Sequence, residues 1–166
     1  TRVVLDASRC GVPQKRKRFF MIGRLGSEDD FLEHSLLSDQ SDHNMTIREY
    51  LGDEFDTEFY YRHPRSYARR GIFSIDEPSP TVRGVNRPIP ATYQIHPGDA
   101  TDDLSRVRPL TTLERARIQT FPREFTFEGS KTDLEQIIGN AVPVELAAYV
   151  GRHLLDYMND CLVEDL

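Results

Sequence analysis

Residues 11–18 of this 166-residue chain read GVPQKRKR, and short apolar runs flank them at residues 2–5 and 19–22. Gly11 and Pro13 favour a turn between the two runs. Each run has the composition of a strand buried on both faces, as strands of a parallel α/β sheet are. Two strands are too few for a doubly wound sheet, which needs several strands and crossover helices. We therefore expect the edge of a sheet whose remainder lies elsewhere.

Hydrogen-bonding side chains alternate along this stretch. If the chain is extended after the turn, Gln14, Arg16 and Arg18 share one side, and the lysines share the other. Arginine supplies fixed donors and glutamine supplies both a donor and an acceptor, so such a row fits a base edge, a phosphate or a carboxylate. An edge strand protected by charge has the same spacing. The spacing alone leaves both interpretations open.

The composition predicts a folded domain and excludes two other classes of protein. An apolar content of 38% with 10% aromatic residues is enough for a core, which argues against general disorder. No apolar run reaches the roughly 20 residues of a bilayer-spanning helix, and the first residues lack a signal-peptide run. We expect no membrane partner and a cytoplasmic location. Cys10 and Cys161 have no CxxC spacing, which indicates neither a disulfide framework nor a zinc site.

The net charge of -6 argues against a nucleic-acid partner until its distribution is considered. Residues 28–58 hold eleven acids against one arginine, whereas residues 62–88 hold six arginines against two acids. Arginine's planar fork suits bidentate contacts to phosphates and guanine edges. Solvated charged faces are the alternative interpretation of each cluster.

The middle of the chain predicts short elements, because prolines recur between residues 25 and 107. We expect one or two helical turns at residues 46–51, and short strands within residues 73–85 and near residues 93–95.

Clearer helix signals follow near the C-terminus. Thr111 and Glu114 have capping-box spacing, which predicts a helix from Thr111 to about Thr120. Pro143 is favoured at the start of a second helix. An apolar stripe recurs along this helix at helical spacing, as in an ordinary core helix or a helix that packs on a partner, and it consists of Val144, Ala147, Gly151, Leu154 and Met158.

Three stretches carry a resemblance to a known family. Residues 6–18 resemble the motif of form GVPQxRxR in cytosine-C5 DNA methyltransferases. Residues 108–122 (RPLTTLERARIQTFP) and residues 136–143 (QIIGNAVP) are similar to the ninth and tenth motifs of that family. The three stretches follow the family's order and span nearly the whole chain. The chain therefore resembles the C-terminal part of such an enzyme, from the eighth motif to the tenth with the target-recognition domain.

The resemblance implies a fold class and a division of the chain. The fold would be a partial α/β structure, with the edge of a methyltransferase-type sheet, a small, loop-rich, mainly β target-recognition domain, and C-terminal helices. Residues 1–24 would be the C-terminal strands of the catalytic domain. Residues 25–130 would form the target-recognition domain, including the ninth motif. Residues 131–166 would hold the tenth motif and a helix that returns to the catalytic domain.

The resemblance also implies a reaction on double-stranded DNA with S-adenosylmethionine as the cofactor. In the family the target cytosine is rotated out of the duplex, a cysteine thiolate adds to its C6 atom, a glutamate assists at N3, and C5 accepts the methyl group. The residues that would support the flipped cytosine are Gln14, Arg16 and Arg18. The tenth-motif residues that would line the cofactor pocket are Gly139, Asn140, Ala141 and Val142.

Further roles follow from the same comparison of motifs. Residues 79–84 (SPTVRG) resemble a recognition-domain segment in which a threonine, here Thr81, contacts the target region. Base readout would fall to Arg83, Asn86 and Arg87, and phosphate contacts to Arg62, Arg65, Arg69 and Arg70. The residues that carry over onto the ninth motif, which organises the recognition domain, are Arg108, Glu114, Arg117 and Gln119.

Departures from the family pattern limit what this chain can do. Leu113 replaces a frequent arginine of the ninth motif, which puts one salt bridge in doubt. Cys10 follows Arg9 and not a proline, so it does not match the PCQ motif of the catalytic cysteine. The glycine-rich cofactor loop and the glutamate of the ENV motif are missing too. We therefore expect an inactive chain that requires an N-terminal catalytic half or subunit with these motifs.

Alternatives remain open at this point. The chain could be the natural subunit of a split enzyme or a fragment of a longer one. A non-catalytic DNA-binding module derived from the same family, or an RNA-binding protein, would also use clustered arginines.

Overall fold

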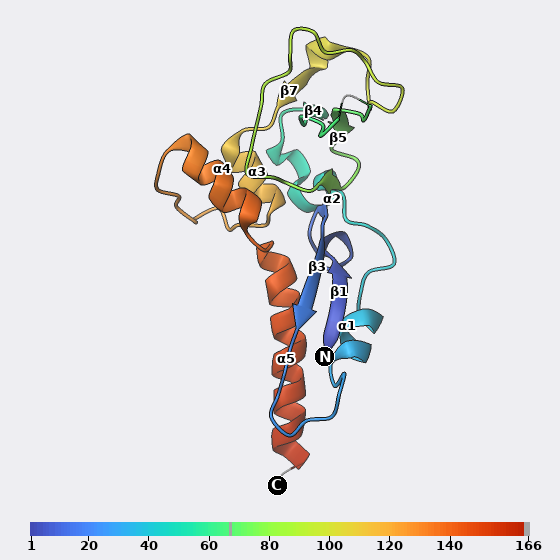
Figure 1. The fold of residues 1–166 in the computed structure, drawn as a ribbon, viewed down its shortest axis with the longest axis vertical. Helices are drawn as coiled ribbons and strands as arrows, with labels where there is room; N and C mark the ends of the chain where they lie inside the picture. The colour runs from blue at the N-terminus through green and yellow to red at the C-terminus, as the bar shows by residue number, and fades with distance from the viewer. Residues whose placement is uncertain (67, 165–166) are drawn as a thin grey trace.

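The computed structural model describes residues 1–66 and 68–164 as an elongated molecule with mixed α/β structure (Figure 1). The strands are β1 (Arg2–Asp6), β2 (Gln14–Lys15), β3 (Lys17–Met21), β4 (Phe59–Tyr61), β5 (Ile72–Ser74), β6 (Ser79–Pro80) and β7 (Val107–Pro109). The α-helices are α1 (Glu33–Ser38), α2 (Ile47–Leu51), α3 (Thr112–Ile118), α4 (Lys131–Asn140) and α5 (Val144–Glu164). Short 3-10 helices occupy Ala7–Arg9, Gly52–Glu54 and Leu104–Arg106.

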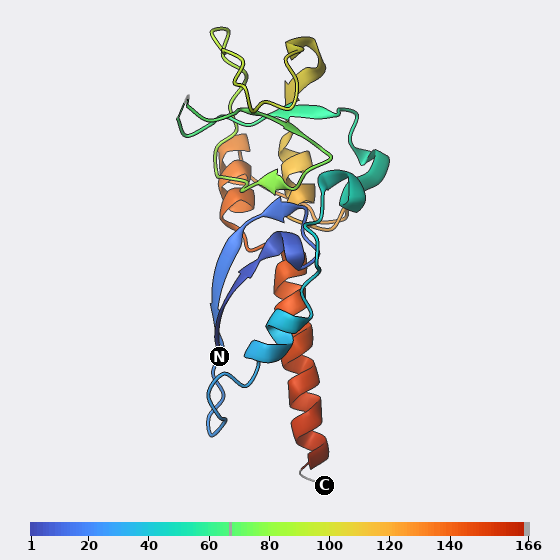
Figure 2. The same cartoon turned by 90° about the vertical axis from the view of Figure 1, so that its right-hand side faces the viewer.

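Strands β1 and β3 form an antiparallel pair beside α5 and α1 in the lower part of the molecule (Figures 1 and 2). The prediction of two strands is confirmed, but they pair antiparallel and not parallel, and within this chain only one face of the pair is covered. A short connection joins them, and such connections permit antiparallel pairing, whereas parallel pairing needs a long crossover. Val3 and Leu5 are buried, while Val4 and its partner Phe19 are 55% and 59% exposed. One face of the pair is therefore open.

The lower core packs this strand pair against helices α1 and α5. Val3 and Leu5 contact the cluster that contains Leu36 of α1 and Leu146 of α5. The Tyr149 hydroxyl donates a hydrogen bond of 2.9 Å to the Leu36 carbonyl, which fastens α1 to α5. Residues 32–38 thus belong to the same core as β1.

Helix α5 begins directly after Pro143, as predicted, but it buries a different stripe. The buried side chains are Leu146, Tyr149 and Val150. In the predicted stripe Ala147 is exposed and Met158 is 50% exposed, so this stripe is not a core face of the chain itself. Both stripes are apolar at helical spacing, so only the position of β1 and α1 selects between them. No helix in the described ranges combines the length and apolar content of a bilayer-spanning segment.

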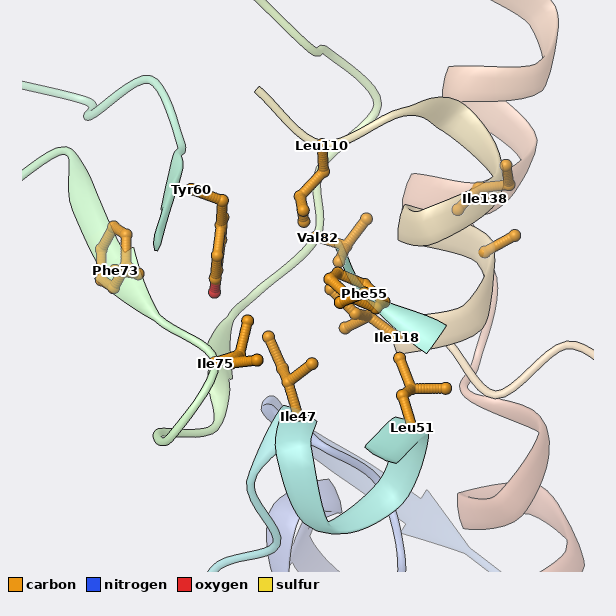
Figure 3. Packing of buried hydrophobic residues seen from close by; sticks show 11 residues of the cluster. Ile47, Leu51, Phe55, Tyr60, Phe73, Ile75, Val82, Leu110, Ile118 and Ile138 are labelled. Carbon is orange, nitrogen blue, oxygen red and sulfur yellow. The ribbon is translucent and has the colours of Figure 1, made fainter. Parts of the chain in front are cut away.

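The upper core consists of side chains from strands β4 and β5, from helices α2, α3 and α4, and from the segments between them. Strand β4 lies between β5, which is antiparallel to it, and β7, which is parallel to it. Figure 3 shows Tyr60 and Phe73 of these strands on one side of the cluster near Ile75, with the aliphatic side chains of α3 and α4 on the other side and those of α2 below. The cluster comprises Ile47, Leu51, Phe55, Tyr60, Phe73, Ile75, Val82, Leu110, Ala116, Ile118 and Ile138.

The helices predicted at residues 46–51 and after Thr111 are present, but their lengths differ from the predicted lengths. Helix α2 falls within residues 46–51, and α3 follows Thr111, whose hydroxyl accepts from the Glu114 amide while the Glu114 carboxylate accepts from the Thr111 amide. Helix α3 ends at Ile118 and not at Thr120, because Thr120 has a φ of +60°. Helix α4 was not expected. Its capping box of Ser130 and Asp133 is the sequence signal that would have found it.

The predicted strand near residues 93–95 is wrong, whereas β5 and β6 lie in or next to the predicted 73–85 segment. Asp99 explains the difference, because its carboxylate accepts hydrogen bonds from the Tyr93 hydroxyl and the His96 amide. The same carboxylate accepts the amides of Gly71 and Ile72. The segment is therefore a loop organised around one side chain.

Candidate nucleic-acid interface

A groove of about 860 Å³ lies between the end of the lower strand pair and the loops of the upper part. Lys15 and Arg18 line it from the GVPQKRKR stretch. Glu77 is the acidic residue among its described lining. The arginines that line it from the upper part are Arg62, Arg65, Arg69, Arg70 and Arg83. Two stretches of sequence that are far apart thus form one basic surface.

The arginines of the groove differ in how far they are free to meet a ligand. Arg70 forms a bidentate pair with Glu77, and its guanidinium lies 4.2 Å from the centre of the Phe73 ring. Arg65 and Arg69 are exposed, and within the described ranges no ion pair involves either of them. A polyanion in the groove would meet Arg65 and Arg69 first.

Arg62 and Arg83 use their guanidinium groups to hold backbone. The Nη2 atom of Arg62 donates to the Thr81 carbonyl at 2.9 Å, and Arg83 donates to the His63 carbonyl. Burial lowers the pKa of Arg62 to about 10, with a further contribution from the charge of Arg83. Arg62 is still a cation at neutral pH. Both side chains therefore organise the wall of the groove.

Asn86 and Arg87 lie away from the groove, in the lining of a separate small pocket of about 30 Å³. The amide of Asn86 donates to the Leu110 carbonyl at 2.6 Å, whereas Arg87 is exposed. Thr81 lines the groove and donates its hydroxyl hydrogen bond to the Lys15 carbonyl at 2.9 Å. Six of the eight residues expected to contact DNA line the groove, and Asn86 and Arg87 do not.

Gln14, Arg16 and Arg18 do not converge on one pocket. Gln14 and Arg16 are 0% and 3% exposed, and they point into the junction between the two cores. Arg18 lines the groove. Burial still alternates through Arg18, which is half-buried between the exposed Lys17 and Phe19, but the strand partner changes, because β2 pairs with β6 and β3 pairs with β1. Lys15, which sequence reasoning left out, faces the groove because Gln14 on the other side is buried.

Gln119 is the centre of the junction between the two cores. Its side-chain oxygen accepts from Gln14 Nε2 at 2.8 Å, and its own Nε2 donates to the Ile138 carbonyl at 2.5 Å. Its backbone carbonyl accepts from the Val144 amide at 3.1 Å, which ties the start of α5 to the end of α3. The three stretches that carried the family resemblance therefore meet at one buried side chain.

Two ion pairs shape the helices at this junction. Arg108 makes a bidentate pair with Glu114 at the start of α3, with distances of 2.9 and 2.6 Å. Burial opposes ionisation of Glu114, but hydrogen bonds from Arg108 and the Thr111 amide hold its pKa below the usual value. Arg115 and Glu135 form a buried pair that joins α3 to α4. Leu113, where the family often has arginine, is 65% exposed.

The expected cofactor residues lie at the end of α4 and in the turn that leads to α5. Gly139 and Ala141 direct their carbonyls inward to Arg16, at 3.0 Å each. Asn140 and Val142 are exposed. An amide and an aliphatic side chain, the chemistry that one side of an adenosine compound could contact, are therefore exposed next to each other here.

Cys10 does not have the environment of a catalytic nucleophile. Cys10 is 3% exposed in the lower core, where burial and the neighbouring Asp6 raise the pKa of its thiol to about 11. The thiol of Cys161 lies on the last turns of α5 and accepts a hydrogen bond of 2.8 Å from Arg24. A nucleophilic thiol needs a lowered pKa and access to its substrate, and Cys10 has neither.

The fold and the sequence both have relatives among methyltransferases. The crystal structure of the S. pombe Dnmt2 methyltransferase matches with a TM-score of 0.52 at 18% identity, covering 95% of this chain and 57% of that one. The model of the C-5 cytosine-specific DNA methylase family matches residues 1–156. The chain belongs to this family, so the resemblance read from the motifs is confirmed, and the partial α/β fold class is confirmed with it.

Two bacterial relatives are much more similar to this chain. The type II methyltransferase M.HindV of Haemophilus influenzae is 60% identical over 158 residues, which is 95% of this chain and 52% of that protein. The type II methyltransferase M.HgiDI of Herpetosiphon aurantiacus is 57% identical over 166 residues, with 99% and 53% covered. The chain therefore spans about half the length of these relatives.

Proposed function

We propose that this chain is the DNA-recognising C-terminal part of a cytosine-C5 DNA methyltransferase. The complete enzyme would transfer a methyl group from S-adenosylmethionine to a cytosine rotated out of duplex DNA. The observation that carries the proposal is the basic groove, in which Arg18 of the GVPQxRxR motif lies on the same surface as Arg65 and Arg69. That surface joins a residue of the expected cytosine pocket to the expected DNA-binding loops.

Within the groove, phosphate contacts fall to the exposed cations Arg65 and Arg69, with the exposed Lys15 on the opposite stretch. Phosphate contacts position a protein on DNA, and each one releases counterions. Arg70 contributes less because Glu77 neutralises it. Base readout by Arg83, Asn86 and Arg87 stays part of the proposal, with Arg83 on the groove and the other two beyond its rim.

The proposal divides the chain as the resemblance implies, into residues 1–24, 25–130 and 131–166. The packing supports a later first boundary, because Leu32 and Leu36 share a core with β1. It supports a close association of the second and third parts, because Ile138 of α4 completes the upper core.

An N-terminal catalytic part is required under this proposal. The chain contains neither a PCQ nor an ENV sequence, and Cys10 is buried in the lower core. The open face of the β1–β3 pair, where Val4, Phe19 and Met21 are more than half exposed, is the surface that the N-terminal part would cover. The relatives' greater length supports the existence of such a part.

S-adenosylmethionine would supply the methyl group when bound. Asn140 and Val142 would line one side of its pocket, because their side chains are exposed at the turn after α4. Gly139 and Ala141 would act through the backbone that Arg16 holds. Arg18 would bind the flipped cytosine, and the buried Gln14 and Arg16 would support this site from the protein interior.

A non-catalytic DNA-binding module is the second candidate, because the exposed arginines alone would serve it. The presence of Arg18 on the groove and of an exposed Asn140 and Val142 favours the enzyme, since a simple DNA-binding module needs none of them. An RNA-binding protein would use the same charges on single strands.

The experiment is a binding titration of this chain against labelled duplex DNA, in competition with unlabelled single-stranded RNA. We expect the chain to bind duplex DNA more tightly than single-stranded RNA. We also expect the logarithm of the affinity for DNA to fall linearly with the logarithm of the salt concentration. Replacing Arg65 or Arg69 with alanine should reduce that slope by about 0.9 for each phosphate that the variant no longer neutralises. Stronger competition by RNA would favour the third candidate.

A further inference from the structure

Three consecutive carbonyls on one wall of the groove each accept a hydrogen bond from a different arginine. The Thr81 carbonyl accepts from Arg62 Nη2 and the Val82 carbonyl from Arg16 Nη1, both at 2.9 Å. The Arg83 carbonyl accepts from Arg115. These arginines come from the end of β4, the GVPQKRKR stretch and α3, so three distant parts of the chain hold one short segment, residues 81–83.

Further hydrogen bonds fasten segment 81–83 to the GVPQKRKR stretch. The Val82 amide donates to Gln14 Oε1 at 2.8 Å, and the Thr81 hydroxyl donates to the Lys15 carbonyl at 2.9 Å. Arg16 also donates through Nη2 to the carbonyls of Gly139 and Ala141, at 3.0 Å each. Arg16 therefore links the groove wall to the turn that follows α4.

The chemistry of Arg16 suits a structural clamp and not a ligand contact. It is buried, and among the described residues no carboxylate pairs with it. Its planar fork reaches carbonyls on two sides at once, which the single ammonium group of lysine cannot do with the same geometry. Because backbone carbonyls accept hydrogen bonds from both Nη1 and Nη2, these nitrogens bind the protein itself and not a ligand.

We propose that Arg16, Arg62 and Arg115 are positioning residues that hold segment 81–83 in its binding geometry. Thr81 and Arg83 are then already ordered when DNA binds. The inference concerns how the groove works and rests on the proposed function for its DNA ligand. A preorganised segment lowers the ordering cost of binding. The three arginines contribute to affinity without contacting phosphates themselves.

The test compares Arg16→Gln, Arg16→Lys and Arg62→Gln with Arg65→Gln as the matched control, by titrating duplex DNA at several salt concentrations. Circular dichroism and thermal unfolding establish that each variant is folded. Both Arg16 variants and Arg62→Gln should lose affinity on the order of tenfold, because bonds from a charged donor are removed. Their salt slope should match that of the unmodified chain. Arg65→Gln should lower the slope by about 0.9.

Two results would overturn the proposal. A slope that falls by about 0.9 in Arg16→Gln or Arg62→Gln would assign that arginine to a phosphate. Unchanged affinity in the folded Arg16 variants would show that segment 81–83 needs no such clamp. Full recovery of affinity in Arg16→Lys would mean that only the charge matters, which also contradicts the clamp. If the Arg16 variants do not fold, the affinity and the salt slope of Arg62→Gln test the proposal instead, because Arg62 is only half-buried.

Hydrogen exchange separates this proposal from the proposed function. In Arg62→Gln and Arg16→Lys, the Val82 amide should exchange at least about tenfold faster than in the unmodified chain, while the β1–β3 amides keep their rates. This result is expected whether or not the chain binds DNA. Equal protection of Val82 in all variants would overturn the clamp, whereas failure of the unmodified chain to bind duplex DNA would overturn only the proposed function.

Discussion

Gly139 of α4 lies against the backbone of Gly84 so closely that a methyl group on Gly139 would stand less than 3.0 Å from both the Gly84 nitrogen and the Arg83 carbonyl carbon. Both neighbours are backbone atoms, which cannot swing aside as a side chain can. The helix that ends in the tenth motif and the end of segment 81–83 are therefore in direct contact, and the absence of a side chain at residue 139 permits it.

Gly139→Ala should destabilise the protein by about 1–3 kcal/mol, since extra volume in a packed contact forces backbone shifts. Helix propensity alone predicts the opposite sign, because alanine is favoured over glycine within a helix by up to about 1 kcal/mol. Chemical denaturation measures the difference. Gly151→Ala on α5 is the matched control, because nothing lies within 4 Å of its added methyl group. A stabilised Gly139→Ala variant would contradict the packing described here.

Glu114→Gln should lower the free energy of unfolding by about 1–3 kcal/mol at neutral pH, because Arg108 loses a charged acceptor. The pKa of Glu114 is lower in the folded chain than in the unfolded one. Its contribution is therefore fully present above the unfolded pKa of about 4.3 and is lost as the pH falls through the folded value. Denaturation curves at descending pH should show the two proteins converging. Glu124→Gln, at an exposed position, should change little, and a constant gap at all pH values would refute the assignment.

Asp99→Asn should disorder the loop that holds residues 93–99 against β5. The carboxylate accepts from the Gly71 and Ile72 amides and from Tyr93 and His96, so an amide would turn a donor toward other donors. We expect a cost of about 2 kcal/mol or more and faster proteolysis in this loop. The exposed Asp102→Asn serves as the control. Equal proteolysis of the two variants would show that Asp99 does not organise the loop.

The two thiols should react at very different rates with a thiol reagent at pH 8. Cys10 is buried and its pKa is raised to about 11, so almost none of it is thiolate, whereas Cys161 is partly accessible. Mass spectrometry of the alkylated protein should find the label on Cys161 first. Labelling of Cys10 should require unfolding. Rapid labelling of Cys10 in the folded chain would contradict the position given to it in the lower core.

Local signals in the sequence predicted the elements that depend on local chemistry. The capping-box spacing at Thr111 predicted the start of α3, and the structure shows the same arrangement at Thr46 before α2 and at Ser130 before α4. The buried face of α5 could not be predicted, because Ala147 and Leu146 are both apolar and only the contact with β1 chooses between them. The antiparallel pairing of β1 and β3 depends likewise on the short connection between them, in which the Ala7 amide donates to the Arg16 carbonyl at 3.0 Å.

The sequence predicted which residues make up the candidate site better than it predicted how their side chains are arranged. The sequence identified the arginines around residues 62–83, and the groove contains most of them. It could not distinguish Arg65, which is exposed, from Arg62, which holds the Thr81 carbonyl. Alternation placed Gln14 and Arg16 on one side correctly, but that side is the interior. Tertiary contacts decide which guanidinium groups remain free.

The most direct test of the central claim is methyl transfer to duplex DNA by mixed halves. This chain would be combined with the N-terminal part of the Haemophilus influenzae relative, which ends where the similarity to this chain begins, together with S-adenosylmethionine carrying a radioactive methyl group. We predict label on cytosine C5 from the mixture, none from either half alone, and a large loss when Arg18 is replaced by alanine. Methyl transfer by this chain alone, or none from a mixture of folded halves that binds DNA, would contradict the account.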